Sequence, residues 1–258
     1  MSEASDQATQ SAAQPAAEQS AQHFDPASSS AEIAAATARL LDTARTLSDD
    51  DVLAPSVLPD WTRGHVLTHI ARNADGLSNL LGGATAGEQR TAYPSRDART
   101  ADIEAGSRRP IKELIADIEG AHERFVAAVA AVPPSRWDFR QAWGSAGQTR
   151  EASHLLEARL REVAIHHIDL DAGYSAADWS PEFALLILQS VLPAFESRGL
   201  APCTLRPTDI DAVVDANGGS GLEVSGDAHA LTTWLLGRDH GGSLKVTGGD
   251  LPTPPDWT

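Results

Sequence analysis

The sequence predicts an α+β fold, in which an N-terminal four-helix bundle is followed by a small α/β domain. Between residues 31 and 196, apolar side chains recur at helical spacing over long segments. Beyond Leu200 the apolar segments are short, β-like and separated by Gly-rich turns. A length of 258 residues suits two unequal domains. We therefore expect a disordered tail over residues 1–30, the bundle over residues 31–176 and the C-terminal domain over residues 177–258.

The tail and the first helix differ sharply in composition. Residues 1–30 consist mainly of Ala, Gln, Ser, Glu and Pro and carry almost no large apolar side chain. Such a segment buries too little surface to offset the entropy lost on ordering. From Ala31 onward, Ile33, Leu40 and Leu47 follow a helical period. This pattern predicts the first helix of the bundle.

The second helix carries a histidine on its apolar face. Thr62 is a suitable N-cap, and His69 follows at a position that shares one face with Val66 and Ile70. The pair Gly82-Gly83 predicts the end of this helix. A loop rich in Thr, Arg and Asp is expected from residue 83 to residue 106, and it could line a substrate site.

The next helices are bounded by capping residues and prolines. Pro110 suits the first turn of a third helix, which the prolines after Val132 end. Thr149 could cap a fourth helix that continues to Gly173. Ser180, followed by proline and glutamate, predicts a fifth helix at the start of the C-terminal domain.

The C-terminal domain is expected to combine short strands with one helix. The β-like segments are CTLRP, IDAVVD, GLEVSG and SLKVTG, and the amphipathic segment DAHALTTWLLGRD lies between the last two. The alternation of these short elements with Gly-rich turns predicts a small α/β unit.

Charge and cysteine content exclude several classes of partner. The chain has 36 acidic and 20 Lys or Arg residues, for a formal charge of -16. Nucleic acid and anionic membrane surfaces would repel such a protein. No apolar run has the roughly 18 residues that a membrane span requires, and the N-terminus lacks the basic start of a signal peptide. With Cys203 as its single cysteine, the protein is expected to be cytoplasmic, and Cys203 to be a small buried residue.

A candidate metal site is formed by His69, Glu162 and His166. Glu162 and His166 are four residues apart, so they lie on the same face of the fourth helix. A third ligand must come from elsewhere, and His69 is the best candidate because an unpaired imidazole on an apolar face is costly. Two histidines and one carboxylate leave a coordination position open, as in catalytic zinc sites. Iron could use the same residues.

Spacing alone leaves other ligands open. His65 lies four residues before His69 and is a rival, and His167 and His154 are nearby alternatives. Asp169 follows His166 by three residues and could accept the second ring proton of a ligating histidine. A solvated charge near the end of the helix is an equally good interpretation of Asp169.

In several segments the sequence resembles the mycothiol-dependent maleylpyruvate isomerases, a DinB-like family. The segments are, in order, LPDWTRGHVLTHIARNADGLSNLL, EARLREVAIHHIDL, GLEVSGDAHALTTWLLGRD and LPTPPDW. The resemblance implies a DinB-type four-helix bundle that binds zinc, followed by a small α/β domain. It also implies that His69, Glu162 and His166 are the metal ligands and that Arg238 recognises the substrate.

Arg238 would supply the positive charge that an anionic substrate needs in an acidic protein. A guanidinium can bind a carboxylate through two parallel hydrogen bonds. A cation placed favourably near the end of a helix is the alternative interpretation of Arg238. Further candidates that sequence does not rank are Arg63, Arg72, Arg108, Arg109, Arg159 and Arg161.

The implied reaction isomerises a small dicarboxylate, maleylpyruvate, to fumarylpyruvate with mycothiol as cofactor. A thiolate adds to the cis double bond, the resulting single bond rotates, and loss of the thiolate leaves the trans olefin. The rival functions are a mycothiol S-transferase that acts on electrophiles and a metal-binding module without chemistry. The sequence makes no prediction of an oligomeric state.

Overall fold

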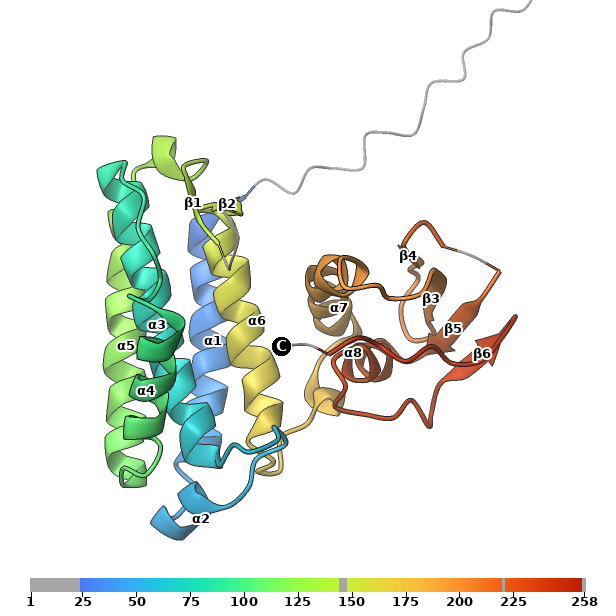
Figure 1. Cartoon of the computed structure of the whole chain (residues 1–258), viewed down its shortest axis with the longest axis horizontal. Coiled ribbons are helices and arrows are strands. Elements are labelled where there is room, and N and C mark those ends of the chain that lie inside the picture. The colour runs from blue at the N-terminus through green and yellow to red at the C-terminus, as the bar shows by residue number, and fades with distance from the viewer. Residues whose placement is uncertain (1–23, 144–147, 220, 257–258) are drawn as a thin grey trace, which may run out of the picture.

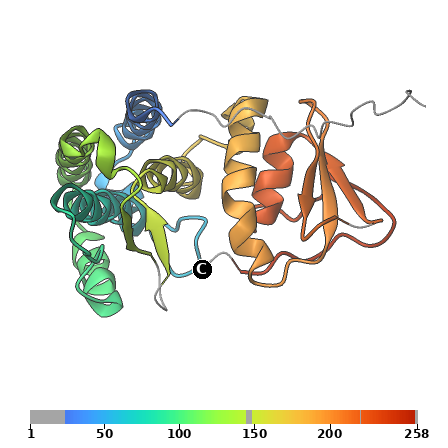
Figure 2. The same cartoon turned by 90° about the horizontal axis from the view of Figure 1, so that it is seen from above.

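The computed structural model describes residues 24–143, 148–219 and 221–256, and it confirms the predicted fold class. Helices α1, α3, α5 and α6 form the bundle, and helices α7 and α8 lie between the bundle and a small sheet (Figures 1 and 2). The bundle helices span Pro26–Ala44, Arg63–Ala86, Ile111–Ala131 and His154–Asp169, whereas α7 and α8 span Pro181–Glu196 and Ala228–Leu235. Two single turns of 3-10 helix, Pro134–Arg136 and Ala176–Asp178, lie in the connections. No helix of the described residues combines the length and apolarity that a membrane crossing requires.

Helix α1 begins at Pro26, within the segment predicted as a disordered tail. The Asp25 carboxylate accepts hydrogen bonds from the backbone N–H groups of Ala27 and Ser28, at 3.0 and 3.2 Å. Proline in the first turn suits a helix start because its missing N–H would have no partner there. The expected boundary at residue 30 is therefore corrected to Asp25. Residues 1–23 of the predicted tail lie outside the described residues.

Helix α3 continues through Gly82-Gly83, where the sequence predicted its end. It ends at Gly87, whose φ of 74° is the left-handed conformation typical of a helix C-terminus. The two interior glycines let other segments approach the helix closely. A Cβ at Gly83 would lie 2.7 Å from the carbonyl oxygen of Glu88. The two glycines therefore allow close packing of neighbouring segments against α3. Their low helix propensity was the reason for the wrong prediction that the helix ends there.

The segment expected as a loop between residues 83 and 106 contains helix α4, Arg96–Gly106. Ser95 caps it through a hydrogen bond from the backbone of Ala98 at 3.0 Å. Because Ile103 is its one large buried side chain, the helix lacks the apolar period that identifies amphipathic helices. A short helix α2, Asp49–Leu53, also precedes α3. Helix α4 packs against α3 (Figure 1).

The predicted N-cap of the fourth helix, Thr149, is wrong. Thr149 instead begins strand β2, Thr149–Glu151, which pairs antiparallel with β1, Arg140–Ala142. Helix α6 starts only at His154. Polar residues before a helix suit a strand of a hairpin as well as an N-cap, so local sequence did not separate the two.

The C-terminal sheet has the strand order β4-β3-β5-β6 among the described residues. The strands are β3 (Cys203–Pro207), β4 (Val214–Ala216), β5 (Glu223–Gly226) and β6 (Lys245–Thr247). Strands β3 and β5 are parallel, and the other neighbouring pairs are antiparallel. Each predicted strand segment thus contributes a strand. Helix α8 connects β5 to β6 and packs with α7 on the sheet. Cys203 is buried at the start of β3, as expected.

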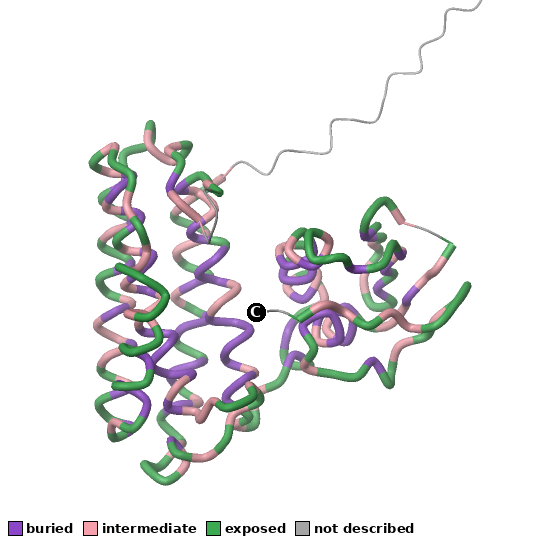
Figure 3. The backbone as a smooth tube through the Cα atoms, in the orientation of Figure 1, coloured by how far each residue is buried: buried purple, intermediate pink, exposed green. Residues whose placement is uncertain are grey.

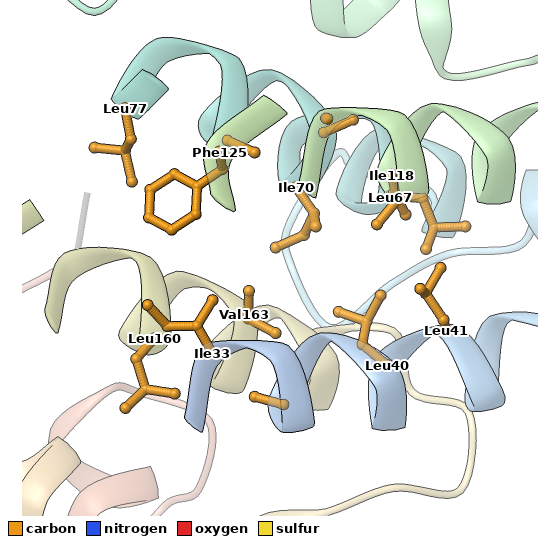
Figure 4. Close-up of a cluster of buried hydrophobic side chains, with 14 of the residues drawn as sticks. Ile33, Leu40, Leu41, Leu67, Ile70, Leu77, Ile118, Phe125, Leu160 and Val163 are labelled. Carbon is orange, nitrogen blue, oxygen red and sulfur yellow. The ribbon is translucent and has the colours of Figure 1, made fainter. Parts of the chain in front are cut away.

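Helix α6 contributes to two hydrophobic cores. Its residues Leu160 and Val163 pack within the bundle, together with Ile33, Ile70 and Phe125 (Figure 4). Its residues Ala164 and Ile165 instead join the core formed by α7, α8 and the sheet. Buried residues accordingly occur along α6 and also in α7 and α8 (Figure 3). Since both units pack on α6, side chains on this helix can meet residues of either one.

Candidate metal centre

His69, Glu162 and His166 converge between helices α3 and α6. The His69 Nε2 atom lies 2.9 Å from Glu162 Oε2 and 3.1 Å from His166 Nε2, and the His166 Nε2–Glu162 Oε2 distance is 3.5 Å. The pair on α6 is one helical turn apart, as the sequence spacing requires, and the bundle brings His69 across from α3. Both histidines are buried. The sequence-predicted residues therefore meet at one point.

The separations of these ligand atoms suit a tetrahedral metal ion. With metal–ligand distances of about 2.0–2.2 Å, tetrahedral ligands lie about 3.3–3.6 Å apart. The observed distances of 2.9, 3.1 and 3.5 Å lie within or slightly below this range. All three residues line a cavity of about 410 Å³. The donor set thus fits zinc, or iron, with a further position open toward the cavity.

Asp169 connects the candidate metal centre to the C-terminal domain. Its fully buried carboxylate lies 2.8 Å from His166 Nδ1, so it can accept the second ring proton of that histidine. The same carboxylate accepts two hydrogen bonds from Arg238, Nε to Oδ1 at 3.0 Å and Nη2 to Oδ2 at 2.9 Å. Asp169 is therefore an orienting group rather than a solvated charge.

The protonation of the three candidate ligands is strongly coupled. Burial lowers the pKa of His69 to about 4. Burial also disfavours a charged His166, but hydrogen bonds to Asp169 and Glu162 outweigh it and raise the pKa of His166 to about 9. Burial tends to raise the pKa of Glu162, yet hydrogen bonds from both histidines bring it well below the usual range. A metal that binds here near neutral pH must therefore displace a proton from His166.

The rival histidines point to other partners. His65 closes the capping box of α3 through its Nδ1 and contacts Glu104 through Nε2 at 2.9 Å. His167 lies 2.7 Å from the Thr43 hydroxyl and stacks on Tyr174. His154 contacts Glu157 at the other end of α6. The structure thereby separates His69 from the alternatives that spacing left open.

Arg238 lines the cavity, but two of its nitrogens are engaged by Asp169 and Nη1 donates to the Leu236 carbonyl oxygen. Its remaining N–H groups are the ones available to a ligand. The other sequence candidates do not line this cavity. Arg63 donates to backbone carbonyl oxygens at the end of α6, and Arg161 donates to the Ser190 carbonyl oxygen. Arg72 and Arg109 both pair with Asp117. Arg159 is buried and donates to Ile70 and Asn73, whereas Arg108 is exposed.

Sequence reasoning missed four polar or aromatic residues of the cavity, Trp61, Asn73, Tyr93 and Arg99. Arg99 contacts a candidate metal ligand directly, because its Nη2 lies 3.1 Å from His69 Nδ1. It comes from α4, in the segment expected as a loop. The Ser95 cap was the signal that could have revealed this helix.

Comparison with known proteins shows what the chain is similar to in sequence and in structure. Residues 33–171 match the family model of the mycothiol maleylpyruvate isomerase N-terminal domain. Two crystal structures of the mycothiol-dependent maleylpyruvate isomerase, one of them a histidine-to-alanine variant, are similar with a TM-score of 0.79. They are 26% and 25% identical in sequence, and the alignments cover 90% of this chain and 97% of those chains. Among curated protein sequences no match is found.

Proposed function

The chain belongs to the mycothiol maleylpyruvate isomerase family, and from this membership we propose that it is an enzyme that converts maleylpyruvate to fumarylpyruvate with mycothiol. The observation that carries the proposal is the convergence of His69, Glu162 and His166 on one cavity that is also lined by Arg238. A thiol-dependent isomerase needs a group that favours the thiolate next to a group that binds an anionic substrate, and this cavity offers candidates for both.

We assign His69, Glu162 and His166 as the ligands of a zinc ion. A divalent metal bound there would lower the pKa of the mycothiol thiol in the open coordination position. Asp169 would keep His166 in the tautomer that presents Nε2 to the metal, because Nδ1 then carries the proton that Asp169 accepts. The chain's own cysteine is an unsuitable nucleophile, since Cys203 is buried in the other core and burial raises its pKa.

Arg238 is proposed to bind a carboxylate of the substrate through the N–H groups that Asp169 and Leu236 leave free. Asp169 holds the guanidinium in place, so little side-chain entropy is lost when the substrate binds. Bound mycothiol would supply the thiolate for a reversible addition to the substrate's cis double bond, which would leave a single bond free to rotate before the thiolate is lost. The positive charge of Arg238 would favour the negative charge that the substrate acquires during this addition.

An assay with maleylpyruvate, mycothiol and zinc tests substrate, thiol and metal together. We expect fumarylpyruvate to form with mycothiol recovered unchanged, as mass spectrometry would show. A persistent mycothiol adduct would instead identify an S-transferase. Absence of turnover with any electrophile, in protein with one bound zinc per chain, would support a metal-binding module without chemistry.

The proposal includes a cytoplasmic location and small molecules as the partners. A single buried, unpaired cysteine is compatible with a reducing compartment. The formal charge of -16 disfavours nucleic acid and anionic membranes as partners.

A further inference from the structure

Arg99 extends from helix α4 into the cavity of the candidate metal centre. Its Nη2 lies 3.1 Å from His69 Nδ1, and its guanidinium lies 5.7 Å from the centre of the Tyr93 ring. Both contacts are with neutral groups that line the same cavity. The guanidinium is thus held in position beside the metal ligands without having its charge neutralised.

Among the described residues, Arg99 lacks the carboxylate partner that several other arginines of the protein have. Arg72 and Arg109 share Asp117, Arg124 pairs with Asp75, and Arg238 pairs with Asp169. Within residues 24–143, 148–219 and 221–256, no carboxylate oxygen lies within 4.0 Å of an Arg99 nitrogen. In a chain with 36 acidic residues, an arginine that lines a cavity without an acidic partner is suited to an anion that enters from solvent.

The hydrogen bond from Arg99 to His69 is incompatible with metal binding by His69. A neutral imidazole carries one proton, and Arg99 can donate to Nδ1 only if that proton is on Nε2. A metal on Nε2 requires the opposite tautomer, with the proton on Nδ1. Two donors would then face each other, so Arg99 must give up this contact. An acceptor placed between them, such as a carboxylate, would satisfy both the guanidinium and the Nδ1–H group.

We propose that Arg99 is a second carboxylate-binding residue of the site, which binding of the metal frees from His69. This inference rests on the proposed function, because it assigns one carboxylate of the dicarboxylate substrate to Arg99 and leaves the other to Arg238. Both arginines line the same cavity but come from different domains, Arg99 from α4 and Arg238 from the segment just after α8. Two cations in one cavity favour a substrate with two carboxylates over one with a single carboxylate.

Binding of inert carboxylates to the zinc-loaded protein tests this role without mycothiol and without turnover. Maleate serves as the dicarboxylate probe and acrylate as the monocarboxylate probe, and isothermal calorimetry measures both affinities. The wild-type protein is expected to prefer maleate. Arg99→Gln should weaken maleate binding about tenfold or more, since a hydrogen-bonded charge is lost, and should largely remove the preference over acrylate.

Arg96→Gln is the matched control, because Arg96 is exposed on the same helix and does not line the cavity. It should bind maleate like the wild type, which would exclude a general effect of net charge. Arg99→Lys keeps the charge but loses the planar donor pair, so its affinity for maleate should lie between those of the wild type and Arg99→Gln. If Arg99→Gln does not fold, a reduced maleate affinity of Arg99→Lys tests the same role.

Zinc binding provides a second readout. Arg99→Gln should bind zinc with the same stoichiometry and with unchanged or higher affinity, because no donor competes for His69 Nδ1. A loss of zinc would show that Arg99 supports the metal ligand, and an unchanged maleate preference would show that it binds no substrate carboxylate. Either result overturns the inference, as does a wild-type protein that does not prefer maleate. Failure of the proposed isomerase activity would appear separately, as absence of turnover with maleylpyruvate and mycothiol.

Discussion

Asp169 at the end of helix α6 and Arg238 just after helix α8 form a buried, bidentate ion pair. The Nε–Oδ1 distance is 3.0 Å and the Nη2–Oδ2 distance is 2.9 Å. Burial tends to raise the pKa of Asp169, but the hydrogen bonds from His166 and Arg238 outweigh it and lower the pKa overall. The carboxylate is thus ionised and serves two purposes. It orients a candidate metal ligand of the bundle and fixes a cation of the C-terminal domain.

Asp169→Asn should weaken both the metal centre and the fold. We expect zinc affinity to fall by about 10–100-fold, because His166 loses the acceptor that fixes its tautomer. Leaving Arg238 buried without its partner should reduce the free energy of unfolding by about 3 kcal/mol. Competition with a chelator measures the first effect and denaturant unfolding the second. Asp171→Asn, two residues away on the surface, should change neither; equal zinc affinity in both variants would contradict the role of Asp169.

His69→Ala and His65→Ala should separate the metal ligand from its sequence rival. His69→Ala is expected to lose stoichiometric zinc and activity together. His65→Ala should retain zinc, since its imidazole contacts Thr62 and Glu104, but it should lose about 1 kcal/mol of stability with the capping box. Metal analysis of the purified proteins provides the measurement. Full zinc in His69→Ala would remove His69 from the proposed ligands.

Arg238→Ala should keep the metal but lose turnover of the dicarboxylate, if its free N–H groups bind the substrate. The expected loss in kcat/KM is about tenfold or more. Arg238→Lys should restore little, because an ammonium does not reproduce the two hydrogen bonds to Asp169. Cys203→Ser should retain nearly full turnover. Wild-type kinetics in Arg238→Ala would eliminate its proposed role, and a large loss in a folded Cys203→Ser protein would relocate the nucleophile.

His167 should make the metal-free protein less stable in acid. Burial lowers the pKa of His167 from its ordinary 6.5 to about 4, so its imidazole is neutral in the folded state. Below about pH 6.5 the unfolded chain takes up a proton that the folded chain does not bind. The free energy of unfolding therefore decreases as the pH falls from 6.5 toward 4, by up to about 1.4 kcal/mol per pH unit for one proton.

The measurement is denaturant unfolding in the presence of a chelator at several pH values. His167→Gln should reduce the slope of stability against pH in this window. His240→Gln is the control, because His240 is exposed and should leave the wild-type slope unchanged. Equal slopes for His167→Gln and the wild type would mean that His167 is protonated within the fold.

Gly64 and Gly120 should respond oppositely to alanine. A Cβ at Gly64 would collide with the carbonyl oxygen of Ser107 and lie 2.7 Å from Val52 Cγ1, so we expect a loss of about 2 kcal/mol. At Gly120 the nearest atom is the flexible end of Arg124, at 3.4 Å, and alanine should stabilise helix α5 by up to about 1 kcal/mol. Thermal unfolding of both variants provides the comparison. A neutral Gly64→Ala would mean that the segment around Ser107 moves away easily.

The errors in the predicted elements have a common cause. Helix α4, the extension of α3 past Gly82-Gly83 and the β1–β2 hairpin all depend on contacts with distant segments. Local sequence favours a break at adjacent glycines and a cap at Thr149. These preferences amount to about 1 kcal/mol each, so packing can override them. The errors therefore fall on short polar elements and on helix ends, whereas the existence of the apolar bundle helices was predicted.

The sequence by itself determined the fold class and the pairing of Glu162 with His166, because helical periodicity and a spacing of four residues are local properties. It also named His69 and Arg238, through resemblance to a family. Only the tertiary structure decided that His69 rather than His65 faces this pair, that Arg238 is already held by Asp169, and that Arg99 reaches His69. Each of these relationships joins residues at least 30 positions apart, and only the packing of α3, α4, α6 and α8 brings them within hydrogen-bond distance.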